Sequence, residues 1–160
     1  MAAPPSERRS ALSVRSARTC ERILDAAGDC FAAVGFAKTT VDEVASRAGV
    51  SKALVYHYFT GKEAILDAVL QRTVAEWERL TIDELAAAEG SVLDRIAQMH
   101  RACMAYAGKA PVLRAILEFD PRILLGTGAG RAMKQSMERL RAVLENAIRS
   151  GVASGELRAD

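Results

Sequence analysis

The stretch KTTVDEVASRAGVSKALVYHYF, residues 38–59, places a glycine between two short segments that each begin at a helix-capping residue. Thr40 followed by Glu43 is a capping box, because the threonine hydroxyl can accept from the amide three residues on while the carboxylate reaches back. Gly49 favours a tight turn, and Ser51 is a preferred N-cap for the second segment. This spacing predicts two short helices joined by a glycine turn, which is a helix-turn-helix.

Composition indicates that helices make up the rest of the chain as well. Half of the 160 residues are hydrophobic, which is enough for a sizeable core, and there are only 11 Gly and 4 Pro. The strict alternation typical of strands is nearly absent, whereas Ala, Leu, Glu and Arg are abundant. The sequence therefore predicts an all-α protein, with a three-helix head that contains the helix-turn-helix, followed by a helical bundle.

The second helix of the motif has an apolar side and a side suited to a polar partner. Its outward-facing residues are expected to be Lys52, Ala53, Leu54, Tyr56, His57 and Tyr58. Ammonium, phenol and imidazole groups can donate to phosphate oxygens, while Ala53 and Leu54 can contact thymine methyl groups in the major groove. For single residues another interpretation stays open, with Tyr58 partly buried and His57 merely solvated.

Helix starts offer a further way to hold phosphates, because their amides carry partial positive charge and lack partners within the helix. Such starts are expected at Thr40, at Ser51 and at Lys62. The candidate DNA-binding residues are thus Thr39, Thr40, Ser51, Lys52, Ala53, Leu54, Tyr56, His57, Tyr58 and Lys62.

Positive charge is concentrated in the first part of the chain. Residues 1–62 hold 9 Lys and Arg against 6 Asp and Glu, net +3, whereas residues 63–160 hold 13 against 14, net −1. Helical spacing of apolar residues begins at Ser16, and the preceding Pro, Ser and Arg residues predict a flexible basic arm over residues 1–17. Such an arm is either a solvated tail or a segment that follows a DNA groove.

Several classes of protein are disfavoured. The three cysteines, Cys20, Cys30 and Cys103, are odd in number and lack ligand-like spacing, so neither a disulfide framework nor a metal site is expected. We expect no cofactor and no catalysis, since no carboxylate pair or nucleophile with its base is apparent. No apolar run reaches the length of a membrane span and no signal peptide is apparent, so a cytoplasmic protein without a membrane partner is expected.

Residues 22–70, RILDAAGDCFAAVGFAKTTVDEVASRAGVSKALVYHYFTGKEAILDAVL, resemble the TetR family of bacterial transcription regulators. The features that match are the Gly35–Phe36 break, the Thr39–Thr40 start, the Gly49–Val50–Ser51 turn, Val55–Tyr56 with Tyr58–Phe59, and the Lys62–Glu63 opening of the fourth helix. Two positions depart from the family pattern: Leu54 stands where small polar residues are common, and Gly61 where a Ser or Asn cap is usual. The departure at Leu54 implies fewer polar contacts with bases.

The resemblance implies a DNA-binding domain over residues 18–62 and a helical domain over residues 63–160 that binds a small effector and forms a homodimer. Adaptable thioethers and aromatic rings suit apolar ligands. The candidate effector-binding residues are Trp77, Met99, Cys103, Tyr106, Phe119, Met133 and Met137. Core packing accounts for the same residues equally well. The GTGAG run at residues 126–130 is expected to be a flexible connection.

Family members usually continue past a break such as Gly151–Glu156 into two more long helices that form the dimer interface. The sequence ends at Asp160, so the expectation is a shortened chain, either a fragment or a protein that dimerises unusually. On this expectation the chain is a monomer or a weak dimer at micromolar concentration.

Three functions are therefore compared. The leading one is a sequence-specific DNA-binding transcription regulator, expected to be a repressor that a small apolar effector releases from a palindromic operator. The second is a helical interaction module that has lost operator binding, and the third is an all-helical enzyme. The sequence names neither the operator nor the effector, and it does not separate repression from activation.

Overall fold

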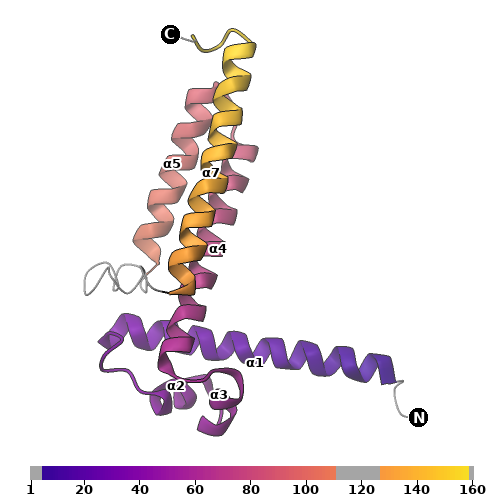
Figure 1. Ribbon diagram of the computed structural model, residues 1–160, viewed down its shortest axis with the longest axis vertical. Coiled ribbons are helices and arrows are strands. Elements are labelled where there is room, and N and C mark those ends of the chain that lie inside the picture. The colour runs from indigo at the N-terminus through magenta and orange to yellow at the C-terminus, as the bar shows by residue number, and fades with distance from the viewer. Residues whose placement is uncertain (1–4, 111–126, 159–160) are drawn as a thin grey trace. The chain divides into compact units, whose positions relative to one another are not determined.

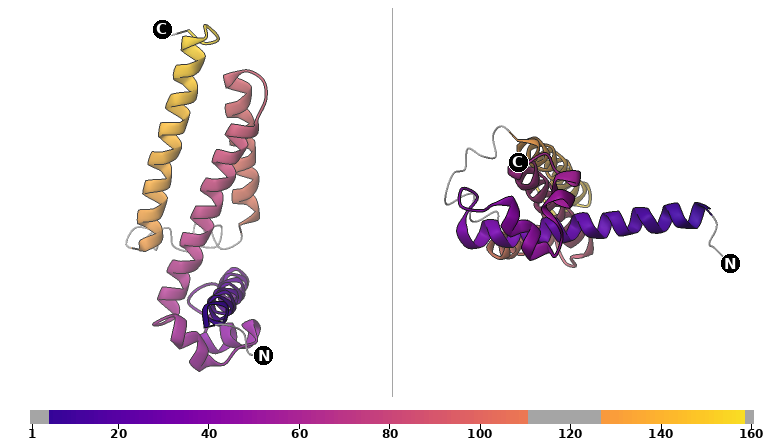
Figure 2. Two further views of the ribbon diagram at one scale, coloured as in Figure 1. Left: turned by 90° about the vertical axis from the view of Figure 1, so that its right-hand side faces the viewer. Right: turned by 90° about the horizontal axis from the view of Figure 1, so that it is seen from below.

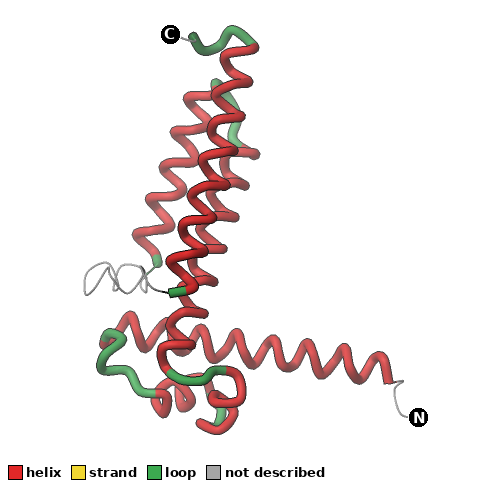
Figure 3. Tube along the Cα trace, viewed as in Figure 1, coloured by secondary structure: helices red, strands yellow, loops and turns green. Residues whose placement is uncertain are grey.

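The computed structural model describes residues 5–110 and 127–158, and these residues form helices joined by loops, without strands (Figure 3). The helices, labelled in Figure 1, are α1 Pro5–Val34, α2 Val41–Ala48, α3 Lys52–Tyr58, α4 Lys62–Ala87, α5 Val92–Lys109 and α7 Gly128–Ala153. The predicted all-α class is therefore confirmed. No helix in these two ranges is long and apolar enough to cross a membrane.

The chain divides into two compact units, Met1–Val69 and Leu70–Asp160, and the division falls within α4. The sequence places the boundary between the head and the helical domain earlier, after residue 62. Because α4 continues from one unit into the other, it covalently links them as a single helix.

Helix α1 begins at Pro5, whereas the sequence predicts a helix only from Ser16. The structure therefore corrects the predicted flexible arm, because residues 5–17 are helical. Proline suits the first position of a helix, where its missing N–H would have no partner and its φ is already helical. No Gly or Pro follows until Gly28, and the intervening Arg, Ala and Leu residues favour helix.

The first unit packs α1 against α2, and α2 against α3 (Figure 1). Each element contributes large side chains to the core, among them Ile23, Phe31, Val44, Val55 and Ile65, none more than 2% exposed. Burying a side chain of this size stabilises a fold by roughly 1.5–3 kcal/mol. The short helices α2 and α3 are held in place by this packing, because helices of this length are marginal in isolation.

The second unit consists of the later part of α4 with α5 and α7, which run alongside one another (Figure 2). Leu85, Met99 and Leu140, one from each helix, form its buried cluster, and the partly buried Trp77, Ile96, Val143 and Leu144 pack against them. Between α4 and α7, the fully buried hydroxyl of Ser136 donates to Glu78 Oε2 over 2.8 Å. Arg139 Nη2 donates to the same oxygen over 2.6 Å.

Helix α7 begins earlier than the sequence predicts. Gly128 and Gly130 belong to its first turn, and Thr127 is its N-cap, with the amide of Gly130 donating to Thr127 Oγ1 over 3.2 Å. The part of the GTGAG run that the structure describes is thus a helix start, because the threonine cap compensates for the low helix propensity of glycine. Phe119 lies outside the described residues.

Candidate nucleic-acid interface

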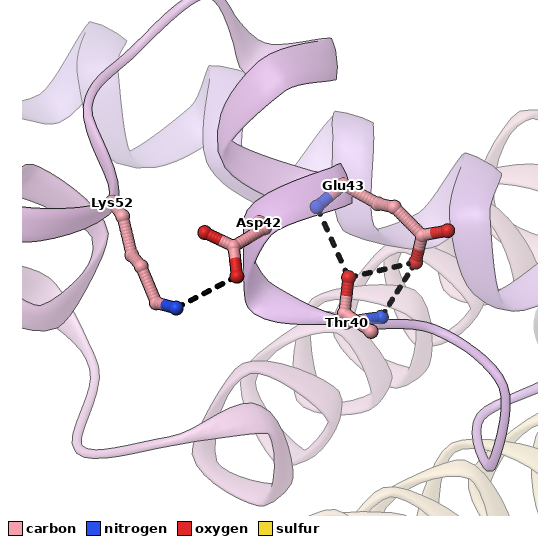
Figure 4. Close-up of polar contacts among 4 residues, drawn as sticks. All are labelled: Thr40, Asp42, Glu43 and Lys52. Carbon is pink, nitrogen blue, oxygen red and sulfur yellow. Dashed lines mark hydrogen bonds and ion pairs between the residues drawn. The ribbon is translucent and has the colours of Figure 1, made fainter.

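The capping box predicted at the start of α2 is present (Figure 4). The amide of Glu43 donates to Thr40 Oγ1 over 3.2 Å, and the amide of Thr40 donates to Glu43 Oε2 over 2.7 Å. These bonds from the Thr40 amide and hydroxyl lower the pKa of Glu43 below its ordinary value. The carboxylate therefore stays ionised and holds the first turn of α2 in place.

Gly49 ends α2 in the left-handed conformation, with φ of 64°. A side chain at this φ costs roughly 1–2 kcal/mol, so glycine suits the turn. Arg22 on α1 donates from Nη2 to the carbonyl oxygens of Ala48 and Gly49, over 2.5 and 3.3 Å. The guanidinium satisfies the carbonyls left without partners at the end of α2 and ties the turn to α1.

Helix α3 is anchored by one buried residue and exposes most of the others. Val55 is completely buried, and Ser51 caps the helix by accepting from the amide of Leu54 over 3.2 Å. Six of the predicted DNA-binding residues on this segment are exposed: Ser51, Lys52, Ala53, Leu54, Tyr56 and His57. Leu54 is 36% exposed and Tyr56 is 50% exposed, so an apolar and a polar group are presented together.

Lys52 already has a partner within the first unit. Its Nζ lies 2.7 Å from Asp42 Oδ2, and both side chains are largely exposed. This hydrogen bond, together with the charge of Asp42, raises the pKa of Lys52 above its ordinary value. The sequence gives no signal for this pair, because the two residues lie on different helices and at a spacing of ten positions, which matches no helical repeat.

Tyr58 is only half-exposed, in line with the second interpretation considered from the sequence. Its hydroxyl lies 3.0 Å from that of Ser16 on α1, and its ring meets His57 edge-on with centroids 5.5 Å apart. The hydroxyl is thus engaged with α1. Tyr56 and His57 remain the exposed ring-bearing candidates on α3.

Two other predicted contacts are corrected in part. Thr39 is 1% exposed and its hydroxyl donates to the carbonyl of Gly35 over 2.9 Å, so its side chain is part of the core and cannot reach a ligand. Lys62 Nζ donates to the carbonyls of Phe36 and Ala37, over 2.8 and 3.2 Å, and lies 4.5 Å from the Phe36 ring centroid. Its ammonium therefore holds the loop after α1 against the start of α4. The amide of Lys62 at the helix start remains a candidate for phosphate.

The candidate effector residues of the second unit occupy different environments. Met99 is buried in the core, and Trp77 donates from Nε1 to Cys103 Sγ over 2.9 Å. Tyr106 donates to Glu76 Oε2 over 3.0 Å, and burial together with this carboxylate raises the pKa of Tyr106 to about 12.

Two further candidates lie on α7. Met133 is half-buried, whereas Met137 is 51% exposed and lines an open surface groove of about 580 Å³ with Leu140 and Leu144. Within the described parts of the chain, no group of three or more His, Cys, Asp and Glu side chains is placed to hold a metal ion.

Comparison with known proteins places this arrangement in a family. Residues 23–69 match the model of the bacterial regulatory proteins of the tetR family. SrpR of Pseudomonas putida, an HTH-type transcriptional regulator, is 46% identical over 52 residues, which cover 32% of this chain and 24% of SrpR. The match to TtgW of the same species covers 39% of that protein, so the chain spans well under two thirds of these relatives.

Longer matches extend beyond the head. YhgD of Bacillus subtilis, an HTH-type transcriptional regulator, is 30% identical over 138 residues, which cover 85% of this chain and 70% of YhgD. A TetR-family transcriptional regulator from Mesorhizobium loti superposes with a TM-score of 0.70 at 26% identity, over 88% of this chain and 71% of that one. These relatives are named as regulators and not as enzymes, in agreement with the sequence-based expectation. The resemblance seen in the sequence is thus confirmed, and the chain belongs to the TetR family of bacterial regulatory proteins.

Proposed function

We propose that this protein binds double-stranded DNA through α3 and regulates transcription as a repressor that a small apolar effector releases from a palindromic operator. The observation that carries the proposal is the surface of α3, where Lys52, Leu54 and Tyr56 are exposed around the buried anchor Val55. A soluble helix that faced only water would gain nothing from an exposed leucine beside an exposed tyrosine. Family membership supports the same function.

The proposed interface divides into positioning contacts and base contacts. Tyr56, His57 and the amides at the starts of α2, α3 and α4 donate to phosphates and set the depth of α3 in the major groove. Leu54 and Ala53 contact base edges, and their apolar side chains favour thymine methyl groups. The base preference is therefore expected to be strongest at one or two thymines in each half-site.

The remainder of the proposal concerns assembly and control. Each head reads one half-site, so a two-fold symmetric operator requires a homodimer. The effector acts from the second unit, where Trp77, Cys103 and Tyr106 are half-buried on α4 and α5. Release from DNA then reflects a coupling free energy between the effector site and the orientation of the heads. A DNA-bound regulator of this family works in the cytoplasm.

Selection of genomic fragments tests the DNA-binding part. The purified protein is incubated with sheared DNA of the source genome, and bound fragments are sequenced and footprinted. We expect a small number of enriched fragments that share a two-fold symmetric site. The matched control is Tyr56→Ala, which removes an exposed group from α3 without disturbing Val55, and it should enrich the same fragments weakly. Failure of the wild-type protein to enrich any fragment would favour the interaction module without operator binding.

The regulatory part needs a separate measurement. Transcription from an enriched promoter is followed in vitro with and without the protein, and small apolar compounds are then screened for restored transcription. We expect less transcript with protein alone. An increase in transcript on adding the protein would identify an activator and contradict the repressor proposal. Sedimentation with and without the enriched fragment shows whether two chains bind each site.

A further inference from the structure

Asp42 and Lys52 face each other across the helix-turn-helix (Figure 4). Asp42 lies in the first turn of α2, and Lys52 is the first residue of α3. Their charged groups are 2.7 Å apart, with side-chain exposures of 66% for Asp42 and 50% for Lys52. The ion pair therefore joins two helix starts and is largely exposed to solvent, on the surface assigned above to DNA.

The two acids in the first turn of α2 have different partners. Glu43 accepts from both the amide and the hydroxyl of Thr40, and this completes the capping box. Asp42 takes no part in that box, and its carboxylate accepts from the Lys52 ammonium. Both acids suit the positive end of the helix dipole, but only Glu43 completes the capping box. The pairing of Asp42 with Lys52 is not required by the local structure of α2.

We propose that Asp42 competes with the DNA backbone for the Lys52 ammonium and thereby limits the sequence-independent affinity of the head for DNA. The inference rests on the proposed DNA-binding function. A carboxylate and a phosphate both present anionic oxygens to an ammonium, so Lys52 must exchange one for the other when the head docks. After the exchange, the unpaired Asp42 carboxylate repels nearby phosphates. Asp42 thus acts through Lys52, as a positioning residue.

The exposure of the pair sets the size of the effect. Solvent competes with an exposed ion pair, so its loss changes a binding equilibrium by up to about fivefold. The phosphate backbone is the same in the operator and in DNA of arbitrary sequence. Asp42 should therefore lower the affinity for both by a similar factor. The effect is easiest to measure on arbitrary sequence, where binding depends almost wholly on phosphate contacts.

A double-mutant cycle tests this. The affinities of the wild-type protein, Asp42→Asn, Lys52→Met and the double variant are measured on a duplex of about 20 base pairs and arbitrary sequence, over a range of salt concentrations. We expect Asp42→Asn to raise the affinity about fivefold when Lys52 is present and less than about twofold in the Lys52→Met variant. Lys52→Met should reduce the slope of log affinity against log salt by about one unit.

Asp29→Asn is the matched control, because Asp29 also forms an exposed ion pair, with Arg47 at 3.6 Å, and the substitution changes the net charge equally. Thermal unfolding of all variants separates changes in folding from changes in binding. If Asp42→Asn raised the DNA affinity equally with and without Lys52, the inference would be wrong while the proposed function would stand. An equal rise in affinity from Asp29→Asn would have the same consequence. Absence of binding by every protein in the cycle, on this duplex and on genomic DNA, would overturn the proposed function and the inference with it.

Discussion

The hydroxyl oxygen of Tyr58 on α3 lies 3.0 Å from the hydroxyl oxygen of Ser16 on α1. The two residues are 42 positions apart in the chain, so this contact depends on the packing of the head. It connects the proposed recognition helix to α1 at a point beyond the buried anchor Val55. We therefore propose that Tyr58 orients α3 through Ser16 rather than through a phosphate.

Tyr58→Phe should accordingly change stability more than DNA binding. Loss of one exposed hydrogen bond should lower the free energy of unfolding by about 0.5 kcal/mol, and Ser16→Ala should lower it equally. The salt dependence of DNA binding should stay as in the wild-type protein. Denaturant unfolding and DNA titration measure the two effects. A salt slope reduced by Tyr58→Phe but not by Ser16→Ala would show that Tyr58 contacts a phosphate instead.

Leu54 provides a test of base recognition. An apolar side chain that is 36% exposed on α3 can discriminate bases chiefly through thymine methyl groups. Replacing the contacted thymine by uracil, which lacks only the methyl group, should weaken binding by about 0.8 kcal/mol in the wild-type protein. In the Leu54→Ser variant the same replacement should have little effect. If no thymine of the operator shows this sensitivity in the wild-type protein, Leu54 does not read a methyl group.

Gly49→Ala should destabilise the first unit. Residue 49 has φ of 64°, and an added Cβ would lie 3.1 Å from Arg22 Nη2. The alanine variant would therefore be strained both in its backbone and at its contact with α1. We expect a loss of about 1–2 kcal/mol in the free energy of unfolding. Gly108→Ala is the control, because Gly108 lies within α5 with no atom near an added Cβ. That substitution should be neutral or stabilising by about 0.5–1 kcal/mol.

Glu78 should make the stability of the second unit depend on acid pH. Arg139, followed by Ser136, holds the pKa of Glu78 below its ordinary value of 4.5. Because the folded-state pKa is depressed, this stabilisation is complete above pH 4.5 and is lost as the pH falls through the folded-state pKa. Glu78→Ala should lower the free energy of unfolding at neutral pH by about 1–3 kcal/mol, because Ser136 keeps a buried donor without its acceptor.

The control for Glu78 is Glu145→Ala, since Glu145 pairs with Arg141 on the exposed side of α7 at 3.3 Å. That change should stay within about 0.5 kcal/mol of the wild-type protein. The difference in stability between the wild-type protein and Glu78→Ala should shrink on acidification, as measured by urea unfolding at a series of pH values. A difference that is constant down to acid pH would contradict the assigned role of the carboxylate.

Tyr106 should remain protonated in alkali. Burial and the adjacent Glu76 raise its pKa to about 12 in the folded protein, above an ordinary value of 10.0. Folding therefore favours the neutral phenol, and the stability that it contributes is lost as the pH rises from 10 toward 12. At about pH 11 Tyr106 should still be mostly neutral in the folded protein. The folded Tyr106→Phe variant should therefore show nearly the same phenolate absorbance as the folded wild-type protein. A lower absorbance in the variant would mean that Tyr106 ionises normally.

Local structure of the helix-turn-helix was predictable from the sequence. The bounds of α2, its capping box and the left-handed Gly49 all depend on residues within a few positions of one another, where capping and backbone preferences decide the outcome. The same reasoning places the start of α1 too late, because the Pro, Ser and Arg residues before Ser16 indicate a flexible arm, although arginine favours helix. The family resemblance was also available from the sequence, because its motifs are contiguous.

The partner of each polar side chain was decided by the tertiary structure. Thr39, Lys62 and Tyr58 were all predicted as contacts for DNA, but they bond to Gly35, to Phe36 and to Ser16, respectively. In the second unit, helical spacing identified the apolar face of α7, yet Leu140 is buried while Met137, three residues away, is 51% exposed. A sequence determines which groups can donate, accept or be buried. Which groups meet depends on how helices distant in the chain pack, and only this packing placed Asp42 beside Lys52.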